Sequence, residues 1–521
     1  MRAAPPNQDE TVFGRRAAPL RELAGLLIAL ALALIAVSRL GASPRGVLLY
    51  EDADSVLPAL VAGSLRHGAA QDWALSPVLF GPELAVYLAL SALGLGVGAT
   101  LALNAVLNLL ALYGAFRLVA RVAGDRLPRA ARIPAALAAL AVAVLFILLE
   151  TDASRDALEV VSLLATTTYY SATVIGTLLF CALAARTLTT PGRHGALAAL
   201  GIIAVTCTAS NPLFLAWAVA PVLAVMVLLL ARRALTPLTV RRPVLVIAAG
   251  MLLGLALRIP LARFITADGS LYFRPAEALA SAQYYGQLLA ERAQDPGGAL
   301  SLLALLALIG LNLIWSLRAL REGWGAGAFL LTLGWLAPPA LLLGFILLGT
   351  HAARYLAPLW FFPLLAVVLA PALLGRVRLP PRPRLLGAAA GILVLLAAGF
   401  SLPALVERVR TPHPDIGCVL DWAGAHGGTG AGEFWTVRAA KAYAEDPADF
   451  IQVGATWLPR PWLVNRSDYD GVEVSFLITP AWAAAPDIAG VHATRAAECG
   501  AYALWDLGAT PIRFPAGTAS R

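Results

Sequence analysis

The sequence predicts a membrane protein of the all-α class, with about eleven transmembrane helices and a small α/β domain at its C-terminal end. Of the 521 residues, 59% are hydrophobic and only 13% are charged, whereas soluble domains carry roughly 25% charged residues. Long apolar segments recur between residues 22 and 406, and the composition becomes more polar from residue 407 onward. With a mean hydropathy of +0.76, most of the chain is expected to lie in a lipid bilayer.

The formal net charge of +8 comes from arginine rather than lysine. The sequence has no basic run with interleaved aromatic residues, which binding of single-stranded nucleic acid requires. The excess charge therefore indicates membrane topology, because arginine-rich loops stay in the cytoplasm, and no nucleic-acid partner is expected.

A membrane-spanning helix needs about 20 apolar residues. The first apolar segment, 22–40, follows Arg15, Arg16 and Arg21, which predicts a cytoplasmic tail over 1–21 and a retained anchor rather than a cleaved signal peptide. The other predicted spans are 98–120, 133–150, 163–186, 195–211, 213–231, 243–264, 299–318, 326–349, 356–375 and 385–406.

The segment 83–96 is also apolar, but it offers only about 14 residues, which is short for a span. If it crossed the membrane, the arginine-rich segment 117–132 would lie outside, against the positive-inside rule. We therefore expect a helix on the membrane surface at 83–96.

This choice places the large arginine clusters on the cytoplasmic side, among them Arg232 with Arg233 and the arginines between 376 and 384. The polytopic domain then covers 22–406 and lies in the cell (plasma) membrane. Its first outer loop, 41–97, and the tail, 407–521, face the extracytoplasmic side.

Two of the four cysteines lie in the membrane domain and two lie in the tail. Cys181 and Cys207 lie inside apolar segments, whereas Cys418 and Cys499 bracket the polar tail. An extracytoplasmic tail permits a disulfide, so Cys418 and Cys499 are the candidate pair. Without a Cys-x-x-Cys motif and with only six scattered His, no structural zinc or haem site is expected.

The composition of the tail predicts a small α/β domain. Residues 434–446 suit a helix, whereas 449–455 and 472–480 have strand composition with partial alternation, and 501–508 suit a final strand.

Three carboxylates lie within four residues just beyond the first span, at Glu51, Asp52 and Asp54. Carboxylates this close repel one another, so either one has a raised pKa or all need a cation or a helix end to hold them. A general base can be built in this way. The alternative is a solvated loop beside a membrane helix.

Arg354 lies just before the tenth predicted span, in the stretch from His351 to Tyr355. An arginine on the outer side gains nothing from the positive-inside bias. A phosphate would favour it, because the guanidinium group binds phosphate oxygens in a bidentate manner and stays charged. The alternative is an arginine that reaches the lipid headgroups. Arg258 and Arg263 are the next candidate phosphate ligands.

An outer carboxylate cluster, an outer arginine and a membrane-embedded body suit one reaction. The carboxylate would take a proton from an acceptor hydroxyl, while the arginine neutralises a phosphate leaving group on a lipid. A sugar carried on a polyprenyl phosphate is such a donor.

These features resemble the GT-C superfamily of membrane glycosyltransferases, which use polyprenyl-phosphate sugars. The resemblance rests on "YEDADS" at 50–55, the short helix that begins "GPEL" at 81, "HAARYLAP" at 351–358 and the tail from 407. "DADS" followed by Trp73 and by the "PEL" that contains Glu83 is similar to uncharacterised actinobacterial proteins of this type.

The resemblance implies transfer to a cell-envelope glycan, lipid or protein acceptor, with inversion at the anomeric carbon. It makes Asp54 or Asp52 the catalytic carboxylate, with Glu51 third. Asp54 is preferred because it precedes a candidate helix whose N-terminal amides could orient it. A divalent cation, Mg²⁺ or Mn²⁺, is used by some members and not by others, and no metal ligand is assigned here.

The resemblance also gives the tail a role in holding an acceptor glycan. Trp435 and Tyr469 are among the aromatic residues that could stack on sugars, and the alternative is that they belong to the core of the tail.

Two other classes of function are open to such a chain. A transporter or flippase for a lipid-linked sugar should show broken helices at the bilayer midplane and often an internal repeat. Pro338 and Pro339 interrupt the ninth predicted span, but no repeat is visible. A non-catalytic membrane protein with a partner-binding tail is the other alternative.

Overall fold

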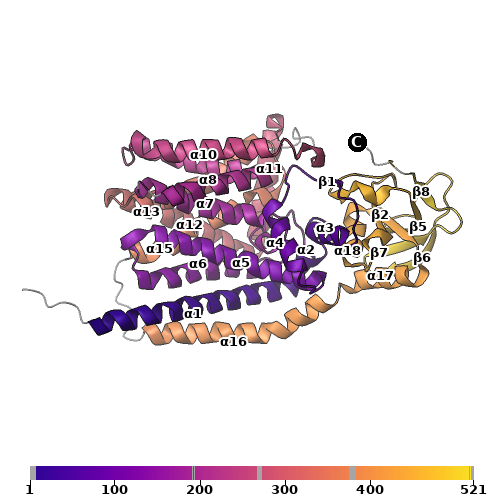
Figure 1. Cartoon of the computed structure of the whole chain (residues 1–521), viewed down its shortest axis with the longest axis horizontal. Coiled ribbons are helices and arrows are strands. Elements are labelled where there is room, and N and C mark those ends of the chain that lie inside the picture. Colours follow the sequence, from indigo (N-terminus) through magenta and orange to yellow (C-terminus); the bar gives the residue numbers. More distant parts are fainter. Residues whose placement is uncertain are drawn as a thin grey trace, which may run out of the picture.

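The computed structural model describes residues 8–190, 192, 194–266, 273–374, 383–515 and 517. Part of the predicted N-terminal tail and part of the arginine cluster between 376 and 384 therefore lie outside the described residues. A bundle of long helices forms one end of the molecule, and a smaller unit with a β-sheet forms the other end (Figure 1).

Nine helical segments in the described part of the chain are long and apolar enough to cross a membrane. They identify a multi-pass membrane protein of mainly helical fold. The segments are formed by α1 (Gln8–Gly41), α5 (Val97–Val122), α6 (Arg132–Leu148), α7 (Ser171–Thr189), α10 (Pro237–Leu257), α12 (Pro296–Arg321), α13 (Gly325–Leu347), α14 (Pro358–Phe361) with α15 (Leu365–Leu373), and α16 (Pro383–Arg410).

Two further apolar helices are shorter, namely α8 (His194–Ser210) and the π-helical η4 (Leu215–Val219) continued by α9 (Ala220–Ala231). A total of eleven spans is reached only if both of these also cross. All eleven segments overlap the predicted ones, because long apolar runs are the strongest signal in the sequence.

The outer faces of the bundle are apolar. Leu252, Leu303 and Phe400 are 69%, 66% and 85% exposed, as expected for side chains that face lipid. The helices α8 and α10 approach closely at Gly254, where an added Cβ would come within 2.8 Å of the Val205 carbonyl oxygen. Small residues permit such close packing of membrane helices.

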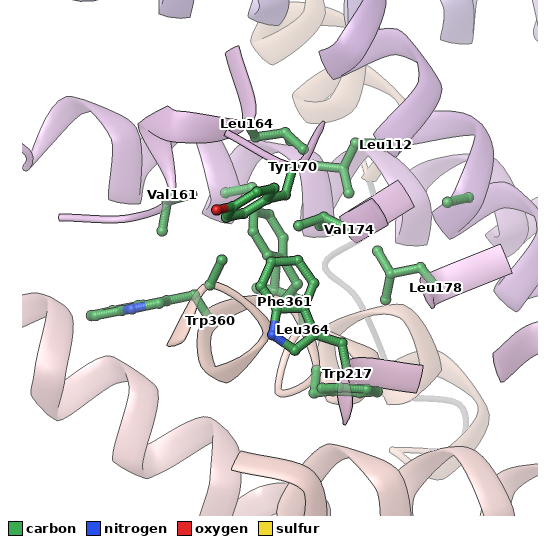
Figure 2. Close-up of a cluster of buried hydrophobic side chains, with 14 of the residues drawn as sticks. Leu112, Val161, Leu164, Tyr170, Val174, Leu178, Trp217, Trp360, Phe361 and Leu364 are labelled. Atoms are coloured by element: carbon green, nitrogen blue, oxygen red, sulfur yellow. The ribbon is translucent and has the colours of Figure 1, made fainter. Parts of the chain in front are cut away.

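The centre of the bundle is filled by aromatic and branched side chains. Tyr170 lies against Trp217 with ring centroids 5.7 Å apart, and Figure 2 shows Val174, Phe361 and Leu364 packed beside them. This cluster packs against the ring of Tyr170, and the Tyr170 hydroxyl group lies at the edge of the cluster (Figure 2).

The prediction of a span over 163–186 was wrong at its start. The helix α7 begins at Ser171, because residues 162–165 form a 3₁₀ turn, η3 (Ser162–Ala165), and Tyr170 has a left-handed backbone with φ of 70°. The Glu150 carboxylate accepts hydrogen bonds from the backbone N–H groups of Val161 and Ser162. These contacts hold the segment before α7 in a folded, non-helical connection.

The predicted span over 243–264 is also shorter in the structure. The helix α10 ends at Leu257, and a separate 3₁₀ turn, η5 (Ala262–Phe264), follows it. Arg258 and Arg263 therefore lie beyond the helix rather than within it.

The first loop contains four short elements: α2 (Gly46–Tyr50), α3 (Leu57–Arg66), β1 (Trp73–Ala74) and α4 (Gly81–Ser91). The helix α4 has 11 residues, which correspond to about 16 Å at 1.5 Å per residue. This length is well below the hydrocarbon thickness of about 30 Å, so α4 does not cross.

The tail folds around a six-stranded sheet with the order β3-β2-β5-β7-β6, in which β8 also pairs with β5. The strand β2 is parallel to β3 and β5, and the other pairs are antiparallel. The elements are α17 (Pro414–His426), β2 (Thr429–Glu433), α18 (Phe434–Tyr443), β3 (Phe450–Val453), β4 (Val464–Asn465), β5 (Val472–Pro480), β6 (Thr494–Cys499), β7 (Tyr502–Asp506) and β8 (Ile512–Phe514).

A disulfide joins Cys418 in α17 to Cys499 at the end of β6, with Cα atoms 5.5 Å apart. It ties the helix to the edge strand of the sheet. Cys181 and Cys207 are free and buried. Tyr469, one of the proposed sugar-stacking residues, is completely buried in the core of the tail.

The tail packs on the first loop. The strands β1 and β4 pair, with Trp73 opposite Asn465, and Arg466 forms an ion pair of 3.0 Å with Asp72. The Tyr443 hydroxyl donates to the Tyr50 carbonyl at 3.0 Å. The acidic stretch and the tail consequently lie at the same end of the helical bundle (Figure 1).

Candidate active site

Asp52 is buried and is held by the protein's own donors. Its Oδ1 atom accepts hydrogen bonds from the backbone N–H groups of Asp54 (3.0 Å) and Ser55 (3.2 Å) and from the Tyr169 hydroxyl (2.9 Å). Its Oδ2 atom lies 3.6 Å from Arg155 Nη1. The first two bonds form the turn that leads into α3, because an Asp side chain can bond to the backbone two and three residues onward.

Burial raises the pKa of the Asp52 carboxyl from 3.8 to about 6, and the neighbouring Asp54 charge adds to this increase. The Tyr169 hydrogen bond, the Arg155 charge and the Ser55 N–H all oppose it. Asp52 therefore holds the turn together through its hydrogen bonds, and its carboxyl group changes protonation state near pH 6.

This shift predicts a pH-dependent stability. A carboxyl with a raised pKa in the folded state favours folding in its protonated form, so its contribution is largest below pH 3.8 and is lost as the pH rises through about 6. The shift corresponds to up to about 3 kcal/mol. In Asp52→Asn, the melting temperature should vary less between pH 4 and 7 than in the wild type. Equal slopes would contradict the pKa assignment.

Asp54 differs from Asp52 in being only partly buried. Among the described residues, no hydrogen bond or ion pair engages its carboxylate. Its charge acts on Asp52, Tyr169 and Arg354. Of the two aspartates, Asp54 is thus the one whose carboxylate is available to an incoming group.

Arg354 lies in the 3₁₀ turn η8 (Ala353–Leu356), just before α14. Its Nη1 atom lies 3.5 Å from Asp156 Oδ1, and its Nε–H donates to the Tyr170 hydroxyl at 3.4 Å. Both contacts are long, and the guanidinium group lies close enough to Asp54 for the two charges to interact. The structure therefore brings the predicted base and the predicted phosphate ligand into one site.

A loop between α6 and α7 supplies Arg155 to the same site. Arg155 interacts with Asp52 at 3.6 Å and with Asp156 at 3.8 Å. Its guanidinium carbon lies 3.4 Å from the ring centroid of Trp435 in the tail, which is a cation–π contact. Trp435 is half exposed at this contact, so it covers Arg155 rather than filling the core of the tail.

A buried network of ion pairs holds this loop in place. Arg45 pairs with Glu159 at 3.2 Å and lies 3.9 Å from Glu150. Arg292 also binds Glu159. Because charges this well buried are stable only when paired, the network fixes the position of the loop.

The tail also contributes Arg438, which sequence analysis missed. It is fully buried in α18, and its Nε–H donates to the Ala53 carbonyl at 2.7 Å. Its Nη1 group binds Gln452 Oε1 at 3.0 Å and the Leu463 carbonyl. Burial lowers the pKa of Arg438 to about 10, and the nearby Asp54 and Asp52 charges oppose this decrease. Arg438 thus ties the acidic stretch to the tail.

Replacing Arg438 with Met should leave the Ala53 and Leu463 carbonyls without this donor. We expect a loss of about 2–4 kcal/mol in the free energy of unfolding, measured as a lower melting temperature of the purified protein. The exposed Arg460 is a matched control, because Arg460→Met removes an arginine from the same domain. An unchanged melting temperature in Arg438→Met would contradict the anchoring role.

A cavity of about 500 Å³ adjoins the site. Tyr170 and Tyr355 line it together with mainly apolar side chains, and Arg258 lies at its wall. The Arg258 guanidinium donates to the carbonyls of Ala209 (2.9 Å) and Pro77 (2.6 Å). Tyr170 links this cavity to Arg354.

Other predicted site residues lie elsewhere. Glu51 binds Arg408 and lines a different cavity. The Glu83 Oε1 atom accepts the Ala172 N–H at 3.2 Å, at the start of α7, and burial raises its pKa to about 7. Glu83 also lines a separate apolar groove. Neither the Glu51 nor the Glu83 carboxylate therefore belongs to the site around Asp54, although all three residues lie in the first loop.

The remaining three candidates lie at the periphery. The Trp73 ring N–H donates to Gln71, and its backbone pairs with the tail. His351 lies 3.6 Å from Glu277. The Arg263 guanidinium carbon lies 4.6 Å from the ring centroid of the adjacent Phe264.

Within the described ranges, no group of three or more His, Cys, Asp or Glu residues could hold a metal ion. No protein-family model matches the chain, and the search of curated proteins found no match.

Proposed function

We propose that this protein is an inverting glycosyltransferase of the GT-C type. It transfers a sugar from a polyprenyl-phosphate donor to a cell-envelope acceptor at the extracytoplasmic face of the plasma membrane. The observation that carries the proposal is that the Asp54 carboxylate, which has no hydrogen-bond or ion-pair partner among the described residues, lies within electrostatic range of a weakly held arginine, Arg354, at one end of a membrane bundle.

In this reaction the acceptor hydroxyl oxygen attacks the anomeric carbon of the donor. The bond between that carbon and the phosphate oxygen breaks, and the hydroxyl proton passes to Asp54. The polyprenyl phosphate leaves with the bonding electron pair. One base and one leaving group suffice for a single displacement, which inverts the anomeric configuration.

Arg354 would stabilise the leaving phosphate. Its present contacts with Asp156 and Tyr170 are 3.5 and 3.4 Å long, so a phosphate oxygen at normal hydrogen-bond distance would compete well with them. Arg155 lies nearby but is already shared between Asp52, Asp156 and Trp435. It keeps the positive charge of the site high without being free to move.

The mainly apolar cavity beside Tyr170 and Tyr355 could receive the first isoprene units of the donor. At about 500 Å³, it has the size of a small-molecule site. Because Tyr170 contacts both this cavity and Arg354, a lipid chain in the cavity would place its phosphate near the arginine.

The proposal is tested with the full chain in proteoliposomes. A panel of polyprenyl-phosphate pentoses and hexoses is supplied with envelope extract as acceptor. The expected result is transfer of one sugar type with inverted anomeric configuration. Retention of configuration, or no transfer from any donor of the panel, would overturn the proposal.

A further inference from the structure

A second cavity of about 420 Å³ lies between the first loop and the tail. Its polar lining comes from Ser43, Glu51, Arg408, His413, Asp415 and Tyr502. The Asp54 and Arg354 site does not share any of these lining residues. A different ligand can therefore occupy this cavity.

Glu51 provides an acceptor that the protein does not use. Its side chain is 5% exposed, and Oε1 binds Arg408. The Oε2 atom is buried and makes no hydrogen bond of normal geometry among the described residues, although the His413 backbone N–H lies near the carboxylate. A buried carboxylate oxygen without a donor is unfavourable, so a ligand hydroxyl that donates to it would gain free energy.

The opposite wall of the cavity is rigid. The Cys418–Cys499 disulfide joins α17, which carries Asp415, to the strand that precedes Tyr502. The Asp415 Oδ2 atom accepts the Ala501 N–H at 2.9 Å. A Cβ at Gly500 would lie 2.2 Å from Asp415 Oδ1, so only glycine permits this approach. The wall is thus preformed.

The polar groups of the two walls face a common space. Burial raises the pKa of Tyr502 to about 12, and the charges of Glu51 and Asp415 add to this increase. The phenol group is therefore near both carboxylates. The Arg408 guanidinium carbon also lies 4.5 Å from the ring centroid of Tyr50, which fixes the orientation of the arginine.

The charges of the lining select against anions. Two carboxyl groups, those of Glu51 and Asp415, share the lining with one guanidinium group, that of Arg408, which already binds Glu51. A phosphate would meet two acidic groups and an arginine that is already paired. Sugar hydroxyls, in contrast, donate to carboxylates and accept from arginine or tyrosine in the same ring.

We propose that this cavity binds a neutral sugar unit of a glycan. Hydroxyl groups of the sugar donate to Glu51 Oε2 and accept from Arg408, and the Tyr502 side chain contacts the sugar ring. Sugar binding in this cavity is separate from the transfer reaction and does not require that reaction to occur.

The test uses the full chain in lipid nanodiscs without glycolipid, because sugar-headed detergents would compete with the probe. Neutral hexose and pentose disaccharides are titrated and followed by saturation-transfer-difference NMR. Saturable binding is expected for at least one disaccharide. Lack of saturable binding for the whole panel, or tighter binding of inorganic phosphate than of any disaccharide, would overturn the proposal.

Two variants locate the binding in the cavity. Val47 lines it and is 41% exposed, so Val47→Trp fills the space without disturbing the core, and Glu51→Gln removes the charge at nearly constant shape. Each should weaken binding about tenfold or more, which corresponds to about 1.4 kcal/mol. Leu65→Trp, at another exposed position, should bind as the wild type does. Wild-type affinity in both cavity variants would place the sugar elsewhere and overturn the proposal.

Discussion

Replacing Asp54 with Asn is expected to lower the turnover of sugar transfer by about 10²–10⁴-fold, the usual contribution of a general base. Asn has nearly the same shape as Asp but cannot accept the hydroxyl proton. Since no hydrogen bond or ion pair within the described residues depends on the Asp54 carboxylate, the melting temperature should stay close to that of the wild type. The measurement is the initial rate of transfer at saturating donor.

Asp487→Asn is the matched control, because Asp487 is exposed in the tail and remote from the acidic stretch. It should transfer sugar at the wild-type rate. Asp52→Asn is a second comparison, because Asp52 is held by three donors and serves the turn. A loss of turnover in Asp52→Asn together with full activity in Asp54→Asn would reverse the roles of the two carboxylates.

Replacing Arg354 with Ala is expected to weaken binding of the donor phosphate by about 30-fold or more, because loss of a partly buried charge partner costs about 2 kcal/mol or more. The effect should fall on the dissociation constant of polyprenyl phosphate, measured by titration of the purified protein. Arg354→Lys keeps the charge without the bidentate geometry, and it should show an intermediate affinity.

Arg274→Ala provides the control for Arg354. Arg274 is exposed, and its only ion pair within the described residues is with Glu277, three residues away, at 3.2 Å. Its removal should leave the affinity unchanged. If Arg354→Ala also bound polyprenyl phosphate with wild-type affinity, Arg354 would not be a phosphate ligand.

Much of the fold could be predicted from the sequence, because lipid imposes long apolar helices and the tail alternates in polarity. The errors fall where local contacts overrule composition. The stretch before α7 is apolar enough for a helix, yet the Glu150 carboxylate and the left-handed Tyr170 keep it irregular. A hydropathy profile carries no information on such hydrogen bonds or on backbone conformation, so it predicts a helix here.

The site was only partly predictable. Asp52, Asp54 and Arg354 stood out as charges at membrane boundaries. The expectation that helix N-terminal amides orient Asp54 was wrong, because the N–H groups of Asp54 and Ser55 donate to Asp52 instead. Glu51 and Asp54 are three residues apart, yet Glu51 binds Arg408 and lines a cavity, whereas the Asp54 charge acts on Arg354.

The contributions of the tail to the site could not be foreseen. Arg438 reaches the acidic stretch across 385 positions in sequence, and Trp435 covers Arg155, which lies in the loop between α6 and α7. One signal was present: Arg438 lies in the middle of a predicted helix among mainly apolar residues, and a charged residue that is buried there needs a partner.

The central claim is that the protein breaks the bond between a sugar and a lipid phosphate at Asp54 and Arg354. A polyprenyl-phosphate sugar labelled in both the sugar and the phosphate, followed through a single turnover in proteoliposomes with acceptor, tests it most directly. The account predicts that wild-type protein separates the two labels and that Asp54→Asn leaves them joined. Movement of the intact, doubly labelled lipid to the other leaflet without separation of the labels would contradict it and indicate a transporter.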